Sequence, residues 1–179
     1  KFSDSGFFVS IDDTNITLPS GEVIKSGLDF RNSFHLWNGI KADFFVPCGG
    51  RPKSIDIDNV SQLFEKDGVT PRFQNIVEGA NLFITDGARI YIQDKGVTLF
   101  KDASTNKGGV TSSSFEVLAG LIMDEAQFNE HMCIGSDGTV PEFYEQYALE
   151  ICHIVENNAA KEFEYIWANA YEGPEHLRM

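Results

Sequence analysis

The feature that most constrains the fold is a pattern of strand, loop and helix that recurs three times from residue 42 onward. Apolar runs at residues 42–46, 75–77 and 97–100 are typical of buried strands. Each run is followed by a polar or glycine-bearing segment and then by apolar residues at helical spacing. Alternation of this kind predicts β-α-β units and a parallel sheet covered on both faces. We therefore expect an α/β fold.

The polar segments that follow the three strands are the candidate functional loops. Right-handed crossovers place such loops at one carboxyl edge of the sheet, which is where open α/β sheets bind ligands. Pro47–Gly50, Glu78–Asn81 and Asp102–Gly109 should therefore line one crevice. The third loop lies in a polar stretch, residues 101–116, that opens a helix, and a helix N-terminus favours anionic groups. An ordinary strand-to-helix connection is the alternative.

Other elements follow from local signals. Pro19–Gly21 predicts a tight turn between two extended segments, and the spacing of apolar residues predicts short helices over Phe30–Asn38 and Ile57–Phe64. Thr85 is a plausible N-cap of a further helix that ends at Gly96. After Pro141, apolar residues recur every four positions, which predicts one amphipathic helix of roughly 28 residues.

Composition excludes several classes of protein. The formal net charge of −13 argues against a nucleic-acid partner, because phosphate contacts need a basic face. No apolar run approaches the roughly 18 residues of a membrane span. The three cysteines are scattered and odd in number, so they predict a reducing, intracellular compartment rather than a disulfide framework. The four histidines lack ligand spacing, so we expect no metal site.

Three superficial motifs fail on their spacing. Gly49–Ser54 lacks the phosphate-loop pattern and contains a proline. Asp102–Asn106 resembles the start of a calcium loop, but lysine and serine stand where that loop needs glycine and glutamate. Ser112–Ser114 has no accompanying pattern of a serine hydrolase. The residues by themselves thus identify no catalytic group.

Three longer segments carry a resemblance. They read F-V-P-C-G-G-R-P at 45–52, V-E-G-A-N-L-F-I-T at 77–85 and F-K-D-A-S-T-N-K-G-G-V-T-S-S-S-F-E at 100–116. In this order and spacing they resemble the large NAD-specific glutamate dehydrogenases of fungi and protists, within the glutamate/leucine/phenylalanine/valine dehydrogenase family. The resemblance covers nearly the whole chain.

The resemblance implies a fold and an activity. The fold would be the second half of a partial Rossmann-like, doubly wound parallel sheet with a long C-terminal helix. Residues 1–140 would belong to the NAD-binding domain, and residues 141–179 would form a C-terminal helical segment. The activity would be the oxidation of L-glutamate to 2-oxoglutarate and ammonia with hydride transfer to NAD. The partners would be these substrates, the rest of a parent chain and further copies in a homo-oligomer, with no membrane.

The resemblance also implies roles for individual residues. Cys48 and Gly49 match small residues that let the cofactor ribose approach. Asn81 matches an asparagine that contacts the nicotinamide-side ribose, and Asn106 matches one that holds the nicotinamide carboxamide.

On the substrate side, Val110 matches a residue that lines the side-chain pocket, and Ser113 matches the hydroxyl that binds a glutamate carboxylate. Two departures stand out, since Lys107 replaces an alanine and Leu82–Ile84 replaces Gly-Pro-Thr of smaller members. The first two strands of the nucleotide domain and the substrate domain, with its catalytic lysine and aspartate, have no counterpart in this sequence. We therefore expect a C-terminal piece of a larger enzyme that is inactive alone and self-associates.

Two alternatives remain open. The parent could be a sister dehydrogenase of leucine, valine or phenylalanine, although an apolar substrate would give the Ser113 hydroxyl nothing to pair with. The piece could also be a non-catalytic regulatory or assembly module that retains the fold. The sequence does not choose between cytoplasm and mitochondrion.

Overall fold

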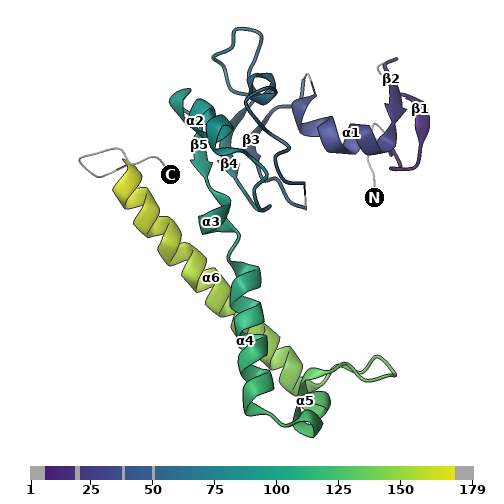
Figure 1. The fold of residues 1–179 in the computed structure, drawn as a ribbon, viewed down its shortest axis with the longest axis vertical. Coiled ribbons are helices and arrows are strands. Elements are labelled where there is room, and N and C mark those ends of the chain that lie inside the picture. The colour runs from purple at the N-terminus through teal and green to yellow at the C-terminus, as the bar shows by residue number, and fades with distance from the viewer. Residues whose placement is uncertain (1–6, 19–20, 38, 50, 172–179) are drawn as a thin grey trace. The chain divides into compact units, whose positions relative to one another are not determined.

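The computed structural model describes residues 7–18, 21–37, 39–49 and 51–171, which form two small sheets and a series of helices (Figure 1). Contacts divide the described chain into two compact units. The first contains the described residues within 1–45, with Pro52–Ile76 and Phe83–Thr98. The second contains the described residues within 46–51, with Val77–Leu82 and the described residues from Leu99 onward.

The first unit begins with an antiparallel hairpin of β1 (Thr14–Thr17) and β2 (Val23–Ser26), in which Ile16 lies opposite Ile24. The hairpin confirms the two predicted extended segments, while Pro19 and Ser20 of the predicted turn lie outside the described residues. Ser26 caps helix α1 (Gly27–Ser33) by accepting a hydrogen bond from the Asp29 amide at 3.2 Å.

The helix predicted over Phe30–Asn38 therefore starts earlier than expected, because the cap is Ser26. α1 is followed by a short 3₁₀ helix, η1 (Phe34–Leu36), and Asn38 lies outside the described residues.

The second sheet has the strand order β3-β4-β5, with β3 at Ala42–Phe45, β4 at Phe73–Val77 and β5 at Thr98–Phe100. β3 and β4 are parallel, with Phe44 opposite Asn75. This sheet confirms the predicted α/β class. Helix α2 (Asp86–Asp94) connects β4 to β5, with Thr85 at its N-cap position and Gly96 just beyond its end, as predicted.

The helix predicted over Ile57–Phe64 is wrong. Only η2 (Val60–Leu63), one turn of 3₁₀ helix, forms there. The turn ends at Phe64, which adopts an extended conformation (φ −117°, ψ 160°) and pairs with Pro71. Pairing with a later segment of the chain thus overrides the local helical pattern.

The core of the first unit consists of fully buried apolar side chains, each of which stabilises the fold by about 1.5–3 kcal/mol. The largest are Ile55, Ile76, Phe83, Ile84 and Ile92.

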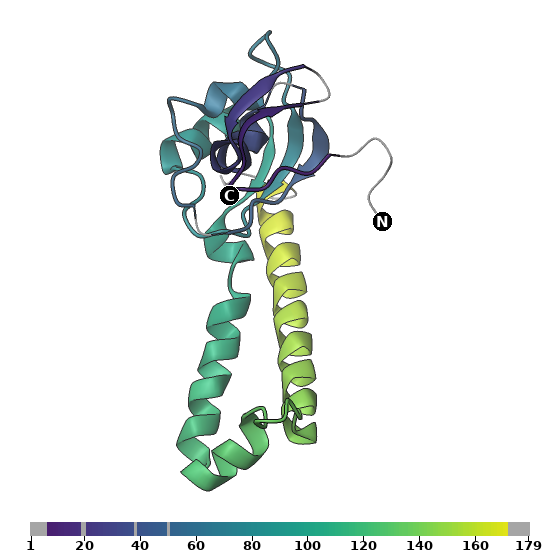
Figure 2. The same ribbon diagram turned by 90° about the vertical axis from the view of Figure 1, so that its right-hand side faces the viewer.

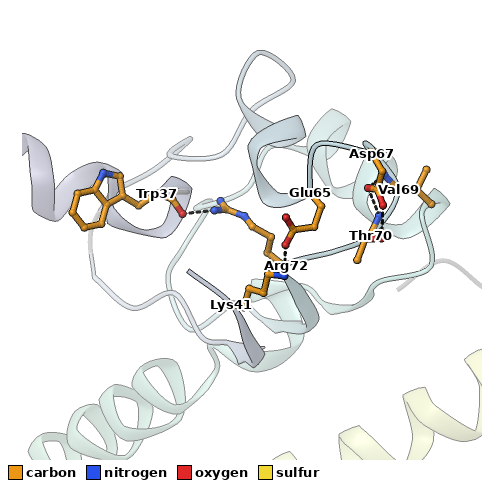
Figure 3. Close-up of polar contacts among 7 residues, drawn as sticks. All are labelled: Trp37, Lys41, Glu65, Asp67, Val69, Thr70 and Arg72. Atoms are coloured by element: carbon orange, nitrogen blue, oxygen red, sulfur yellow. Dashed lines mark hydrogen bonds and ion pairs between the residues drawn. The ribbon is translucent and has the colours of Figure 1, made fainter. Parts of the chain in front are cut away.

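A buried arginine joins the η1 segment to the sheet in the same unit. The Arg72 guanidinium donates to the backbone carbonyl of Trp37 (Figure 3). It also donates to the backbone carbonyl of His35 at 3.4 Å. Burial lowers the pKa of Arg72, and the nearby Glu65 opposes that shift. Glu65 itself pairs with Lys41 at 2.6 Å (Figure 3).

The second unit contains α3 (Asp102–Thr105), α4 (Gly108–Ile122), α5 (Glu125–Met132) and α6 (Glu142–Tyr171). α6 confirms the predicted C-terminal helix, and it packs against α3, α4 and α5. Figure 2 shows α4 and α6 running alongside each other. Among the helices that the structure describes, none is long and apolar enough to cross a membrane.

The helix expected after β5 is divided. α3 ends at Thr105, and Asn106 adopts a non-helical conformation (φ −118°, ψ 50°) before α4 begins. Asn106 thus lies in the short non-helical segment between α3 and α4.

Candidate functional site

The three loops that follow the parallel strands belong to the same compact unit. Residues 46–51 follow β3, residues 77–82 follow β4, and the segment from Leu99 onward carries the end of β5 and α3. This second unit contains all six residues to which the family resemblance gives a role in binding the cofactor or the substrate, namely Cys48, Gly49, Asn81, Asn106, Val110 and Ser113. The grouping agrees with the expectation that the loops meet at one edge of the sheet.

Two glycines shape the first two loops, and one of them lets the loops pack closely. Gly49 has φ +103°, in the region that favours glycine. A Cβ added to Gly79 would lie 2.9 Å from the Cys48 Sγ and 3.2 Å from the Pro47 carbonyl oxygen. A larger residue at Gly79 would therefore displace the loop that carries Cys48. Cys48 is exposed and forms no disulfide.

The two asparagines that were assigned to the cofactor are in direct contact. The Asn106 Nδ2 donates to the Asn81 Oδ1 at 2.7 Å, across 25 residues of sequence. Within the described chain, no further hydrogen bond engages the Asn106 Oδ1 or the Asn81 Nδ2. The pair therefore leaves the amide oxygen of Asn106 as an acceptor and the amide nitrogen of Asn81 as a donor for a further group.

Side chains of α3 hold both ends of the loop that carries Asn81. The Thr105 Oγ1 donates to the Glu78 carbonyl at 2.6 Å, and the buried Asp102 carboxylate accepts the Leu82 amide at 2.7 Å. The Glu78 amide donates to the Phe100 carbonyl at 3.0 Å.

Sequence reasoning missed Asp102 and Thr105. One usable signal was the position of Asp102 at the start of a helix, where a carboxylate can accept backbone N–H groups.

The two residues assigned to the substrate lie on the first turns of α4. Val110 and Ser113 are three positions apart, so they share a helix face, and both are exposed. The Ser113 hydroxyl donates to the Val110 carbonyl at 3.1 Å. Within the described residues, neither side chain forms a hydrogen bond with the asparagine pair.

The long helix α6 contacts the start of α4. The Lys107 Nζ lies 2.5 Å from the Glu162 Oε1, and a Cβ on Gly108 would lie 3.3 Å from the Val155 Cγ1. The lysine that departs from the smaller family members thus has a carboxylate partner.

Comparison with known proteins decides the family. The family model described as Glutamate/Leucine/Phenylalanine/Valine dehydrogenase matches residues 11–173. The chain belongs to this family.

Curated relatives narrow the likeness within the family. The chain is 53% identical over 168 residues to Glutamate dehydrogenase 2 of Dictyostelium discoideum, which is 94% of the chain and 16% of that relative. It is 52% identical over 167 residues to the NAD-specific glutamate dehydrogenase of Neurospora crassa, which is 93% of the chain and 16% of the relative. The counterpart in Saccharomyces cerevisiae is 44% identical over 171 residues. The chain therefore spans about 16% of the length of these relatives.

Membership of the dehydrogenase family gives the second unit its chemical context. Dehydrogenases of this fold class bind a dinucleotide at the carboxyl ends of parallel strands. In this chain the asparagine pair, its supporting α3 side chains and the start of α4 all follow such strand ends.

Proposed function

We propose that this chain is the segment of an NAD-dependent glutamate dehydrogenase that holds the nicotinamide half of the cofactor beside the substrate. The whole enzyme would oxidise L-glutamate to 2-oxoglutarate and ammonia. The observation that carries the proposal is the 2.7 Å hydrogen bond between Asn81 and Asn106, in a chain that resembles enzymes named as NAD-specific glutamate dehydrogenases.

The asparagine pair fits the chemistry of the cofactor. A primary carboxamide has one acceptor and two donors, and a ribose hydroxyl can both donate and accept. The Asn106 Oδ1 and the Asn81 Nδ2 are a matching acceptor and donor. When bound, NAD would supply the acceptor of the hydride, while the protein supplies binding and orientation.

The residues of this chain would act by holding the reactants in register. Asn106 would bind the carboxamide and Asn81 the adjoining ribose, while Cys48 and Gly49 would leave room for the ribose to approach. Because orientation of the reactants contributes several kcal/mol to catalysis, loss of one amide should be costly.

On the substrate side, Val110 would line the pocket, and the Ser113 hydroxyl would turn from the Val110 carbonyl to a glutamate carboxylate. A site that pairs a polar group of its substrate rejects analogues that lack the group. Ser113 would thus favour glutamate over leucine.

The remaining proposals concern the activity of the isolated chain, its division into domains, and the assembly and location of the whole protein. The 179 residues alone should be inactive, since they correspond to about 16% of the relatives' length. The division into residues 1–140 and 141–179, a homo-oligomeric parent and an intracellular location stay proposals.

The test is Asn106→Ala in a full-length protein that contains this chain. We expect kcat/KM to fall about tenfold or more, because the nicotinamide loses its orienting amide. The matched control is Asn129→Ala, which removes an exposed amide from α5 and should leave the kinetics unchanged. An unchanged kcat/KM for Asn106→Ala would refute the proposal and favour an assembly or regulatory module. A preference for leucine over glutamate in the unmodified protein would assign it to a sister dehydrogenase.

A further inference from the structure

We propose that Asp102 and Thr105 are positioning residues, which clamp the Glu78–Leu82 loop so that the Asn81 amide is held in place for the cofactor. The inference rests on the proposed function, and it assigns to α3 a role beyond that of connecting β5 to α4. Neither residue is proposed to touch the cofactor or the substrate.

The Thr105 hydroxyl holds the start of the loop. Its Oγ1 lies 2.6 Å from the Glu78 carbonyl oxygen, and it lies 3.1 Å from the Lys101 carbonyl one turn back in its own segment. The shorter contact joins α3 to the residue at which the chain leaves β4. Because a hydroxyl has a single hydrogen to donate, the distances favour donation across to Glu78.

The Asp102 carboxylate holds the end of the loop. One oxygen accepts the Leu82 amide at 2.7 Å, and the other accepts the Ala103 amide at 2.9 Å. Hydrogen bonds to an ionised acceptor are roughly twice as strong as neutral ones. The peptide unit between Asn81 and Leu82 is therefore fixed by a buried carboxylate.

The backbone conformation of Leu82 shows why that end needs support. Leu82 has φ +54°, in the left-handed region that costs a residue with a side chain about 1–2 kcal/mol. Leu82 is 58% exposed, so packing contributes little to holding this conformation. The bond from the Leu82 amide to Asp102 offsets the cost. Backbone strain next to a candidate ligand-binding residue is where such support is expected.

Together the contacts leave the Asn81 side chain little freedom. Both ends of its loop are tied to α3, and its own Oδ1 accepts from Asn106, which directly follows α3. One short helix thus sets the relative position of both proposed cofactor amides. Small displacements of groups that orient the reactants slow a reaction. Loss of the contact from Thr105 or Asp102 should therefore affect the enzyme by displacing the Asn81 amide.

The test is Thr105→Val in the full-length protein, with Thr105→Ser as the conservative variant. Valine removes the hydroxyl at nearly constant volume, whereas serine retains it. For Thr105→Val we expect the KM for NAD to rise about fivefold or more, with the KM for glutamate changed by less than about twofold. Thr105→Ser should stay within about twofold of the unmodified protein in both. Thr17→Val, at an exposed position of β1, is the matched control and should change neither.

The split between the two KM values separates positioning from general stability. A purely structural loss would reduce the fraction of active enzyme, lowering kcat and leaving both KM values unchanged. A lower kcat with both KM values unchanged would overturn the proposal. So would wild-type kinetics for Thr105→Val, or an equal rise in the KM for NAD in the valine and serine variants. Asp102→Ala supplies a second measurement: a rise in the KM for NAD supports the clamp, and an unchanged value in a folded protein opposes it.

Failure of the clamp is distinguishable from failure of the proposed function. Suppose that Asn106→Ala lowers kcat/KM while Thr105→Val leaves the KM for NAD unchanged. The assignment of Asn106 to the cofactor is then supported, and the positioning role of Thr105 is refuted. If Asn106→Ala leaves kcat/KM unchanged, the assignment of Asn106 to the cofactor is refuted.

Discussion

At the scale of single residues, Asp67 shows how one carboxylate can organise a turn. Its Oδ1 accepts the amides of Val69 and Thr70, each at 2.9 Å, and its Oδ2 accepts the Thr70 hydroxyl at 2.6 Å (Figure 3). These bonds favour the charged form and lower the pKa of Asp67 from 3.8 to about 2, the Thr70 hydroxyl having the largest effect.

The lowered pKa predicts a pH dependence with a definite sign. The ionised Asp67 contributes stability in full above the unfolded-state pKa of about 3.9, and the contribution is lost as the pH falls through about 2. We expect Thr70→Val to raise the pKa of Asp67 toward 3.8, while Thr70→Ser keeps it low. A carboxyl NMR titration of the chain would measure both. An Asp67 pKa that is unchanged in Thr70→Val would contradict the assigned cause.

The residue scale also shows how far the sequence alone could predict the site. Asn81 and Asn106 were identified by resemblance, and the structure brings them to 2.7 Å from each other. The contacts of Asp102 and Thr105 could not be predicted, because they join side chains to backbone groups more than 15 residues away. Residue type and spacing do not reveal which distant carbonyl a hydroxyl will reach.

At the scale of elements, α5 is the helix that sequence reasoning missed. A signal for it was present, because Asp124 and Gln127 form a capping box. The Asp124 carboxylate accepts the Gln127 amide at 2.9 Å, and the Asp124 amide donates to the Gln127 Oε1 at 3.1 Å. The apolar content of this short helix is low, so periodicity gave no indication of it.

The capping box predicts a local stability effect. Asp124→Ala should destabilise α5 by about 1 kcal/mol, because the Gln127 amide in the first turn of the helix loses its acceptor. Amide hydrogen exchange of α5, followed by mass spectrometry, should speed up by about fivefold. Asp124→Asn retains an acceptor and serves as the control, since the two residues cap helices about equally well. Equal exchange in the alanine and asparagine variants would show that the cap does not limit the opening of α5.

Elements with strong local signals were predicted well. The parallel strands and α6 follow from apolar runs and a repeat of about four residues. The helix predicted over Ile57–Phe64 did not form because Phe64 is extended and pairs with Pro71, which ends the turn at Leu63. The break between α3 and α4 could not be foreseen, since no proline marks it.

At the scale of the whole molecule, the described part of the chain exposes many large apolar residues. Large apolar side chains of α4 are exposed, with Leu121 at 76% and Ile122 at 80%. Exposed apolar residues that adjoin on one element mark an interaction surface or an aggregation hazard. The chain also spans about 16% of its relatives' length, so such surface is expected to have partners in a longer protein.

Charge opposes association of the isolated chain, and the balance sets the last prediction. The net charge of −13 repels like copies, but salt screens this repulsion beyond a distance of about 8 Å at physiological ionic strength. Light scattering of the 179-residue chain should therefore show a mass that rises with protein concentration, and more steeply as salt is added. Replacing both Leu121 and Ile122 by glutamine keeps the net charge and should reduce the rise. Val23→Gln, an exposed apolar position of β2, is the control that should not. A monodisperse monomer at high concentration and high salt would show that this surface does not drive self-association.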